Sequence, residues 1–82
     1  MALDVNQVTE EIREVAADFV GIKPDELDLN KKLRLDYGIT SIEASELIME
    51  MEDKYGIKIP VSDAVKILSS QDAIDYVMKH AK

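Results

Sequence analysis

The sequence contains no cysteine and only one histidine, and these two shortages exclude several kinds of site. Without cysteine, the chain has no disulfide framework, no thiolate nucleophile and no cysteine-based zinc site. The single histidine, His80, stands beside Lys79 near the end of the last expected helix, where positive charge is favourable. No motif brings a nucleophile, a general acid and a general base together. The composition therefore argues against an enzyme, and we expect no metal site.

Net positive charge and long apolar runs are also missing. The 17 acidic residues outnumber the 10 basic ones, which gives a formal net charge of −7. Nucleic-acid binding needs clustered cations, so this balance opposes it and favours partners with basic surfaces. The segment Met1–Asp4 does not resemble a signal peptide, and no apolar stretch is long enough for a membrane span. We therefore expect a cytoplasmic monomer.

The chain does have enough apolar residues, and the right spacing, for a packed helical fold. Hydrophobic residues make up 46% of it, which supports one domain over residues 1–82. A first helix ending at Gly21 is predicted by an apolar face with spacings of three and four residues. That face consists of Val5, Val8, Ile12, Val15, Ala16 and Phe19. The opposite side, expected to face solvent, carries Glu10, Glu11, Glu14 and Asp18.

Three further helices follow from the same kind of pattern. We expect one over about residues 41–55, a short one that opens at residue 61 or 62 and contains Val65 and Ile67, and a last one from residue 69 or 70. The long connection over residues 21–40 should be anchored on the core by its leucines, which are Leu27, Leu29, Leu33 and Leu35. The predicted fold class is all-α: a small four-helix bundle with three longer helices, one short helix and a long loop between helices 1 and 2.

The start of the second helix has a reciprocal capping pattern. Thr40 is followed three residues later by Glu43, so its hydroxyl can accept from the Glu43 N–H while the Glu43 carboxylate accepts from the Thr40 N–H. Ser41 then occupies the first helical position and is not needed as the cap. Its hydroxyl is free to point outward at a helix N-terminus, where a phosphate is favoured. The simpler alternative is that Ser41 only helps to start the helix.

The second helix has two different apolar faces. A core stripe is formed by Ala44, Leu47, Ile48, Met51 and Tyr55. On a roughly opposite face, Ile42 and Met49 are bordered by Glu46, Glu50 and Asp53. Such a pair resembles a docking surface, although scattered surface apolar residues are common. Residues 36–53 contain six acidic residues and no basic one, whereas the preceding loop is basic through Lys31, Lys32 and Arg34, which could pair with nearby carboxylates.

Three segments together resemble the acyl carrier protein family. The first is Asp36 followed by Gly38-Ile39-Thr40-Ser41-Ile42, where the family has Asp-Leu-Gly-x-Asp-Ser-Leu. The second is Tyr55-Gly56-Ile57-Lys58-Ile59-Pro60, and the third is Ala73-Ile74-Asp75-Tyr76-Val77. With Gly21-Ile22-Lys23-Pro24 after the first helix, the resemblance covers nearly the whole chain without a gap.

The resemblance implies a carrier rather than a catalyst. Ser41 would receive 4′-phosphopantetheine from coenzyme A through a phosphopantetheinyl transferase, and the arm would hold acyl groups as thioesters. Acyl-loading and acyl-processing enzymes with basic patches would dock on a surface that comprises Asp36, Thr40, Ile42, Glu46, Met49, Glu50 and Asp53. Met51 and aliphatic residues would line a shelter for the acyl chain, or would simply be core.

The chain also departs from the family pattern. Thr40 replaces the usual acidic residue before the serine, Tyr37 replaces a leucine, and Ser45 replaces an apolar residue. These changes favour a specialised carrier, for a modified lipid, an envelope glycolipid or a secondary metabolite, over the general carrier of fatty acid synthesis. Two alternatives remain: a peptidyl or aminoacyl carrier with the same cofactor, and a cofactor-free helical interaction module.

Overall fold

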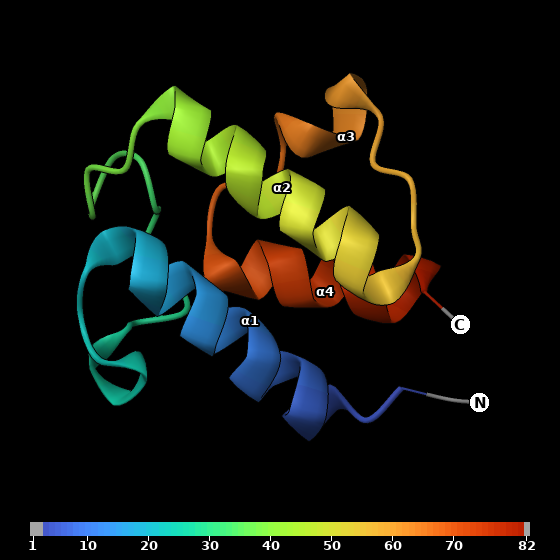
Figure 1. Ribbon diagram of the computed structural model, residues 1–82, viewed down its shortest axis with the longest axis horizontal. Coiled ribbons are helices and arrows are strands. Elements are labelled where there is room, and N and C mark those ends of the chain that lie inside the picture. Colours follow the sequence, from blue (N-terminus) through green and yellow to red (C-terminus); the bar gives the residue numbers. More distant parts are fainter. Residues whose placement is uncertain (1–2, 82) are drawn as a thin grey trace.

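The computed structural model describes residues 3–81, which form four α-helices and one short 3₁₀-helix (Figure 1). The longer helices are α1 (Val5–Val20), α2 (Ser41–Tyr55) and α4 (Ser70–His80), and the short ones are α3 (Val61–Ala64) and the 3₁₀-helix η1 (Pro24–Glu26). No β-strand occurs between residues 3 and 81. The predicted all-α bundle with a long first loop is confirmed. Over the same residues, no helix combines the length and the apolar character that a membrane crossing requires.

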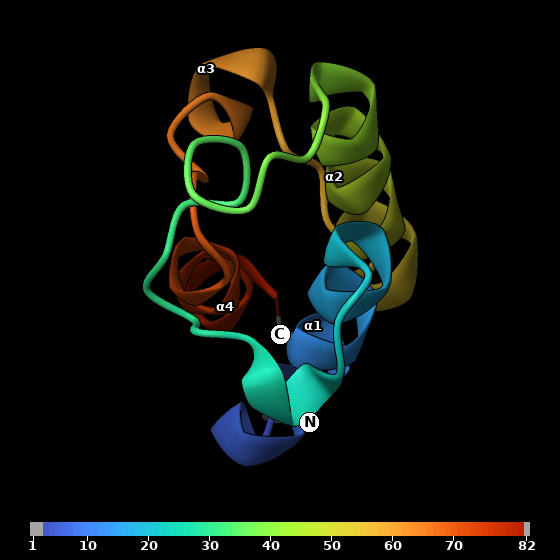
Figure 2. The ribbon, with the colours of Figure 1, turned by 90° about the vertical axis from the view of Figure 1, so that its left-hand side faces the viewer.

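The helices pack around one core. α1 and α4 lie side by side in the most extensive helix contact, α2 packs against α1, and α3 lies on the same side of the α1–α4 layer as α2 (Figures 1 and 2). The core draws on every longer helix and on both long connections, but α3 contributes no fully buried residue. Its buried members are Val8, Ile12, Ala16, Leu27, Leu33, Ile39, Leu47, Met51, Ile59, Ala73, Ile74 and Val77.

Helix α1 ends where the sequence predicts. The Asp4 carboxylate caps it by accepting from the Asn6 N–H at 2.9 Å, and Gly21 ends it in the left-handed conformation at φ 86°. Two details of its predicted faces are wrong. Val5 is 49% exposed, because it occupies the first residue of the helix at the end of the bundle, and Ala17 is buried although it was outside the predicted stripe.

The long first loop is fixed by a small number of buried side chains. Leu27 and Leu33 are buried as predicted and Leu29 is partly buried, but Leu35 is 80% exposed. Leu35 lies within a tight turn in which the Asp36 carboxylate accepts from the Lys32 N–H at 2.8 Å, so the turn directs it away from the core. η1 is a short helical turn with Pro24 at its first position, where the missing N–H of proline costs no hydrogen bond.

The region around α3 is less helical than predicted. The helix ends at Ala64, so Val65 and Ile67 follow it instead of lying within it, and Val65 is 63% exposed. One polar contact ties α3 to α4: the Tyr76 hydroxyl donates to the Asp63 carboxylate at 2.7 Å. Helix α4 begins with the predicted serine, because the Ser69 hydroxyl accepts from the Asp72 N–H at 3.1 Å.

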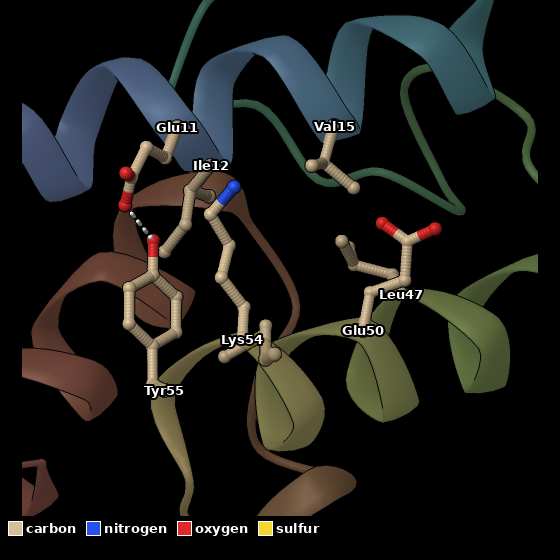
Figure 3. Close-up of a pocket in the computed structure, with 8 residues that line it drawn as sticks. Glu11, Ile12, Val15, Leu47, Glu50, Lys54 and Tyr55 are labelled. Carbon is tan, nitrogen blue, oxygen red and sulfur yellow. Dashed lines mark hydrogen bonds between the residues drawn. The ribbon is translucent and has the colours of Figure 1, made fainter.

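A hydrogen bond between side chains ties the end of α2 to α1. The Tyr55 hydroxyl donates to the Glu11 carboxylate at 2.8 Å (Figure 3). Glu11 is therefore partly buried. The helical pattern predicts a fully solvated position for this residue, and that prediction is wrong. Burial, and then the hydrogen bond and negative charge of Glu11, raise the pKa of the Tyr55 phenol above its usual value of 10.0.

We expect Tyr55→Phe to lower the free energy of unfolding by about 1 kcal/mol at neutral pH, because a partly buried carboxylate loses its donor. The raised pKa makes this contribution complete below pH 10.0 and reduces it as the pH rises further, since the unfolded chain then ionises first. Urea denaturation of both proteins near neutral pH and well above pH 10 would test this. An equal stability difference at both pH values would contradict it.

Candidate functional site

The first turn of α2 has the predicted reciprocal cap. The Thr40 hydroxyl accepts from the Glu43 N–H at 3.0 Å, and the Glu43 carboxylate accepts from the Thr40 N–H at 2.9 Å. Ile39, immediately before the cap, is buried, and its N–H donates to the Leu33 carbonyl at 3.1 Å. The loop therefore holds the start of the helix against the core. The backbone N–H groups of Thr40 and Glu43 each have a side-chain acceptor in the other residue.

Ser41 is the first residue of α2, and its side chain is exposed. The capping bonds use the Thr40 hydroxyl and the Glu43 N–H, so they leave the Ser41 hydroxyl free for other chemistry. The first N–H groups of a helix have no intrahelical acceptor, and the helix dipole adds partial positive charge there. The structure thus presents a primary alcohol to solvent at a place that favours an attached phosphate.

All seven predicted docking residues lie at the surface, but Asp36 in the loop also has a structural hydrogen bond. Ile42 is 72% exposed and Met49 is 54% exposed. The remaining five, also exposed, are Asp36, Thr40, Glu46, Glu50 and Asp53. One carboxylate oxygen of Asp36 already accepts from the Lys32 N–H, so this residue has a structural role in the turn. The exposed helix residues are therefore accessible to a partner protein.

The charges of the helix and the loop do not neutralise each other. Between residues 3 and 81 the structure contains one ion pair, from Arg13 to Glu10 at 3.8 Å. The basic residues of the loop, Lys31, Lys32 and Arg34, therefore do not form the pairs that the sequence made conceivable. Lys31 instead places its ammonium 6.0 Å from the centre of the Tyr37 ring. Across the described residues 3–81, no three histidine, aspartate or glutamate side chains come together in a group that could hold a metal ion.

An apolar groove of about 480 Å³ runs beside Ser41. One wall comes from α2 and consists of Ser41, Ala44, Ser45, Leu47, Ile48 and Met49. The opposite wall comes from α3 and the residues around it, namely Ile59, Val61, Ala64, Val65, Ile67 and Leu68. The loop contributes Lys32, Leu33, Arg34, Leu35 and Ile39. Figure 2 shows this loop lying between α2 and α3 at one end of the molecule.

The groove accounts for most of the large apolar side chains that the fold leaves exposed. Seven such residues are exposed, and five of them line the groove: Leu35, Met49, Val61, Val65 and Leu68. Only Met49 among these five is predicted from the sequence to lie at the surface, so the exposure of the other four is a finding of the structure. These four residues could have been recognised in the sequence because each is an apolar residue in a turn, a short helix or a short connection. Such an element is too short to add the residue to the apolar face of a longer helix. Clustered exposed apolar side chains mark binding surfaces.

A second hollow lies between α1 and α2, but at about 10 Å³ it has room for at most one water molecule (Figure 3). Met51 lines this space and does not line the larger groove. Of the two alternatives that the sequence leaves open for Met51, the described structure therefore favours ordinary core. Met51 is 2% exposed and is part of the ordinary core.

Comparison with known proteins identifies the class of this fold and site. A family model described as "Phosphopantetheine attachment site" matches residues 10–77. The acyl carrier protein of Campylobacter hominis is 37% identical over 71 residues, which cover 87% of this chain and 90% of that protein. The acyl carrier protein of Rubrobacter xylanophilus is 35% identical over 78 residues, which cover 95% of this chain and 96% of that protein.

A solved structure has the same fold. The acyl carrier protein of Enterococcus faecalis superposes with a TM-score of 0.84 over 96% of this chain and 100% of that chain, at 24% sequence identity. The chain belongs to the acyl carrier protein family, whose prosthetic group is covalently attached 4′-phosphopantetheine. It is accordingly a carrier protein and not a catalyst, as its composition predicts.

The two adjacent hydroxyl residues should differ sharply in their effect on stability. We expect Thr40→Ala to lower the free energy of unfolding by about 1 kcal/mol, because the Glu43 N–H loses its cap. Ser41→Ala should stay within about 0.5 kcal/mol of the unchanged protein, because the cap does not use its hydroxyl. Urea denaturation of the two variants measures both values. Equal losses would show that Ser41 shares the capping role.

Proposed function

We propose that this protein carries acyl groups on 4′-phosphopantetheine attached to Ser41. The observation that carries the proposal is the position of this serine: exposed, first in α2, outside the capping bonds and in the lining of the apolar groove. Attachment forms a bond between the Ser41 Oγ and phosphorus, breaks the phosphoanhydride of coenzyme A and releases adenosine 3′,5′-bisphosphate. A phosphopantetheinyl transferase catalyses this step and takes up the hydroxyl proton.

The residues around Ser41 fit this group. The hydroxyl is accessible to a transferase, and the N-terminus of a 15-residue helix stabilises the negative charge of a phosphodiester at that position. Thr40 and Glu43 hold the first turn so that attachment does not compete with the cap. When attached, the cofactor supplies a flexible arm and the thiol for a thioester, which this cysteine-free chain lacks.

The groove is suited to the acyl part of the cargo. Its volume of about 480 Å³ falls within the range of small-ligand sites, and its walls are predominantly aliphatic. Because Ser41 belongs to the lining, an arm attached to it can deliver its acyl group into the groove without crossing the core. Burial of an alkyl chain against these side chains removes apolar surface from water on both partners. The groove therefore shields the cargo between enzymes.

The exposed face of α2 is the proposed docking surface. Ile42 and Met49 supply apolar contact, while Glu46, Glu50 and Asp53 present negative charge to basic patches on partner enzymes. Asp36 and Thr40 lie where a transferase approaches Ser41. Such an acidic surface accelerates encounter and weakens in salt, which suits brief contacts of a cytoplasmic monomer with several enzymes.

The departures from the family pattern support dedication to one pathway. Thr40 preserves the cap but removes the charge that the family usually has beside the serine. A transferase that depends on this charge should modify the protein slowly. We therefore propose a specialised lipid, envelope glycolipid or polyketide-type pathway ahead of general fatty acid synthesis.

Incubation with coenzyme A and a broad-specificity phosphopantetheinyl transferase should increase the intact mass by one phosphopantetheine. Ser41→Ala should abolish the increase, because the attacking hydroxyl is gone. Ser45→Ala is the matched control, since it removes an exposed serine about one turn further along the same helix and should retain the increase. An unmodified protein with several transferases would favour the cofactor-free interaction module. A cofactor that accepts only aminoacyl groups would favour the peptidyl carrier.

Reversing the charge of two α2 carboxylates tests whether the transferase docks on this face, because the attachment residue Ser41 is unchanged. We expect Glu46→Lys combined with Glu50→Lys to slow modification of Ser41 by about tenfold at low salt, because like charges now face the basic patch of the transferase. Glu10→Lys with Glu14→Lys makes the same change in net charge on α1 and should have little effect. The measurement is the initial rate of the mass increase. Equal slowing in both double variants would place docking elsewhere.

A further inference from the structure

The groove contains charges of only one sign. Lys32 and Arg34 are the charged residues in its lining, and no carboxylate is among the lining residues. This selection is unusual in a chain with 17 acidic and 10 basic residues. The carboxylates of α2 lie on the cap or on other faces of the helix, so the loop brings cations to a surface that is otherwise apolar.

These two cations are exposed and are not used elsewhere in the described structure. Neither takes part in the single ion pair found between residues 3 and 81. Exposed cations near a carboxylate-rich helix would gain by pairing, but the turn directs them to the groove. Only the backbone groups of these two residues form hydrogen bonds in the turn. The Lys32 N–H donates to the Asp36 carboxylate, the Lys32 carbonyl accepts from the Asp36 N–H at 2.9 Å, and the Arg34 carbonyl accepts from the Gly38 N–H at 3.1 Å.

The backbone that carries them is firmly positioned. The Leu33 N–H donates to the Leu68 carbonyl at 2.9 Å, and Lys32 forms an isolated bridge with Ser69. Leu33, between the two cations, is 4% exposed. Lys32 and Arg34 therefore flank a buried anchor at the loop end of the groove. Fixed backbone positions reduce the ordering cost when flexible side chains bind a ligand.

We propose that the groove accommodates an acyl group that bears an acidic group distant from its thioester, and that Lys32 and Arg34 bind this anion. The inference rests on the proposed function and specifies its cargo as amphipathic. Aliphatic walls receive the alkyl part, while a lysine and a planar guanidinium bind a carboxylate or a similar anion. A purely aliphatic cargo leaves both cations without a role.

The phosphodiester on Ser41 is an alternative ligand for Lys32 and Arg34, because it is also an anion. The N-terminus of α2 already provides N–H donors and a positive dipole for a group on that residue. The cations come from a different segment of the chain, the turn at residues 32–36. An acid at the far end of the cargo therefore complements Lys32 and Arg34 better than the phosphodiester does. If these cations bound the phosphodiester, they would do so even when the arm carries no cargo.

The test loads the full chain with octanoyl or octanedioyl phosphopantetheine, which have the same number of carbons and differ by a terminal carboxylate. Cleavage of each thioester by hydroxylamine is measured and divided by the rate for the same acyl-coenzyme A. We expect the octanedioyl group to be protected about fivefold more than the octanoyl group, with the difference lost at high salt. Lys32→Gln with Arg34→Gln should remove the difference. Lys31→Gln, a cation of the same loop outside the groove lining, should retain it.

Each other outcome overturns the inference in a distinct way. Equal protection of the two cargoes would show that the groove does not select an acid, while the carrier function stands. If the double variant instead changes the amide chemical shifts of the Ser41 region in the protein that carries the unloaded arm, the cations bind the phosphodiester and not an acid on the cargo. Failure of any loading on Ser41 would reject the proposed function itself. Circular dichroism of the double variant confirms that it is folded.

Discussion

The position at which α2 begins determines the rest of the site, and two interactions fix it together. Burial of Ile39 holds the end of the loop on the core, and the reciprocal bonds of Thr40 and Glu43 start the helix at Ser41, two residues later. Because side chains follow a 100° rotation, this start sets the direction of every residue up to Tyr55. A start shifted by one residue would turn Ser41 away from the groove and Leu47 out of the core.

The same helix separates two kinds of surface. Its outward face combines the apolar side chain of Ile42 with the carboxylates of Glu46 and Glu50, whereas its inner edge joins Ser41 to the groove. Lys32 and Arg34 lie on the groove side. The negative charge of the outward face and the positive charge at the groove therefore lie at different places on the protein. A chain of strongly negative net charge can in this way keep a local site for an anion.

Sequence reasoning identified the elements that depend on local chemistry. Thr40, Gly21 and Ser69 act through neighbours within a few residues, so their roles could be predicted, as could the four helices. Features that depend on tertiary arrangement could not. Leu35 looked like a core leucine because its exposure depends on the turn at Asp36, and Glu11 looked solvated because its partner, Tyr55, lies 44 residues away. The groove itself was beyond reach, since its walls come from three separate segments.

The single polar tether of α3 has a consequence for the energetics of the groove. α3 has only four residues, none of them fully buried, and the Tyr76 hydroxyl is its side-chain contact with α4 through Asp63. The opposite wall belongs to a long helix that shares the main core. Local opening is easiest where few apolar groups are buried, so one wall can yield while the other stays rigid. Any local opening of the groove is therefore expected at the α3 wall, with the packing of α1 against α4 undisturbed.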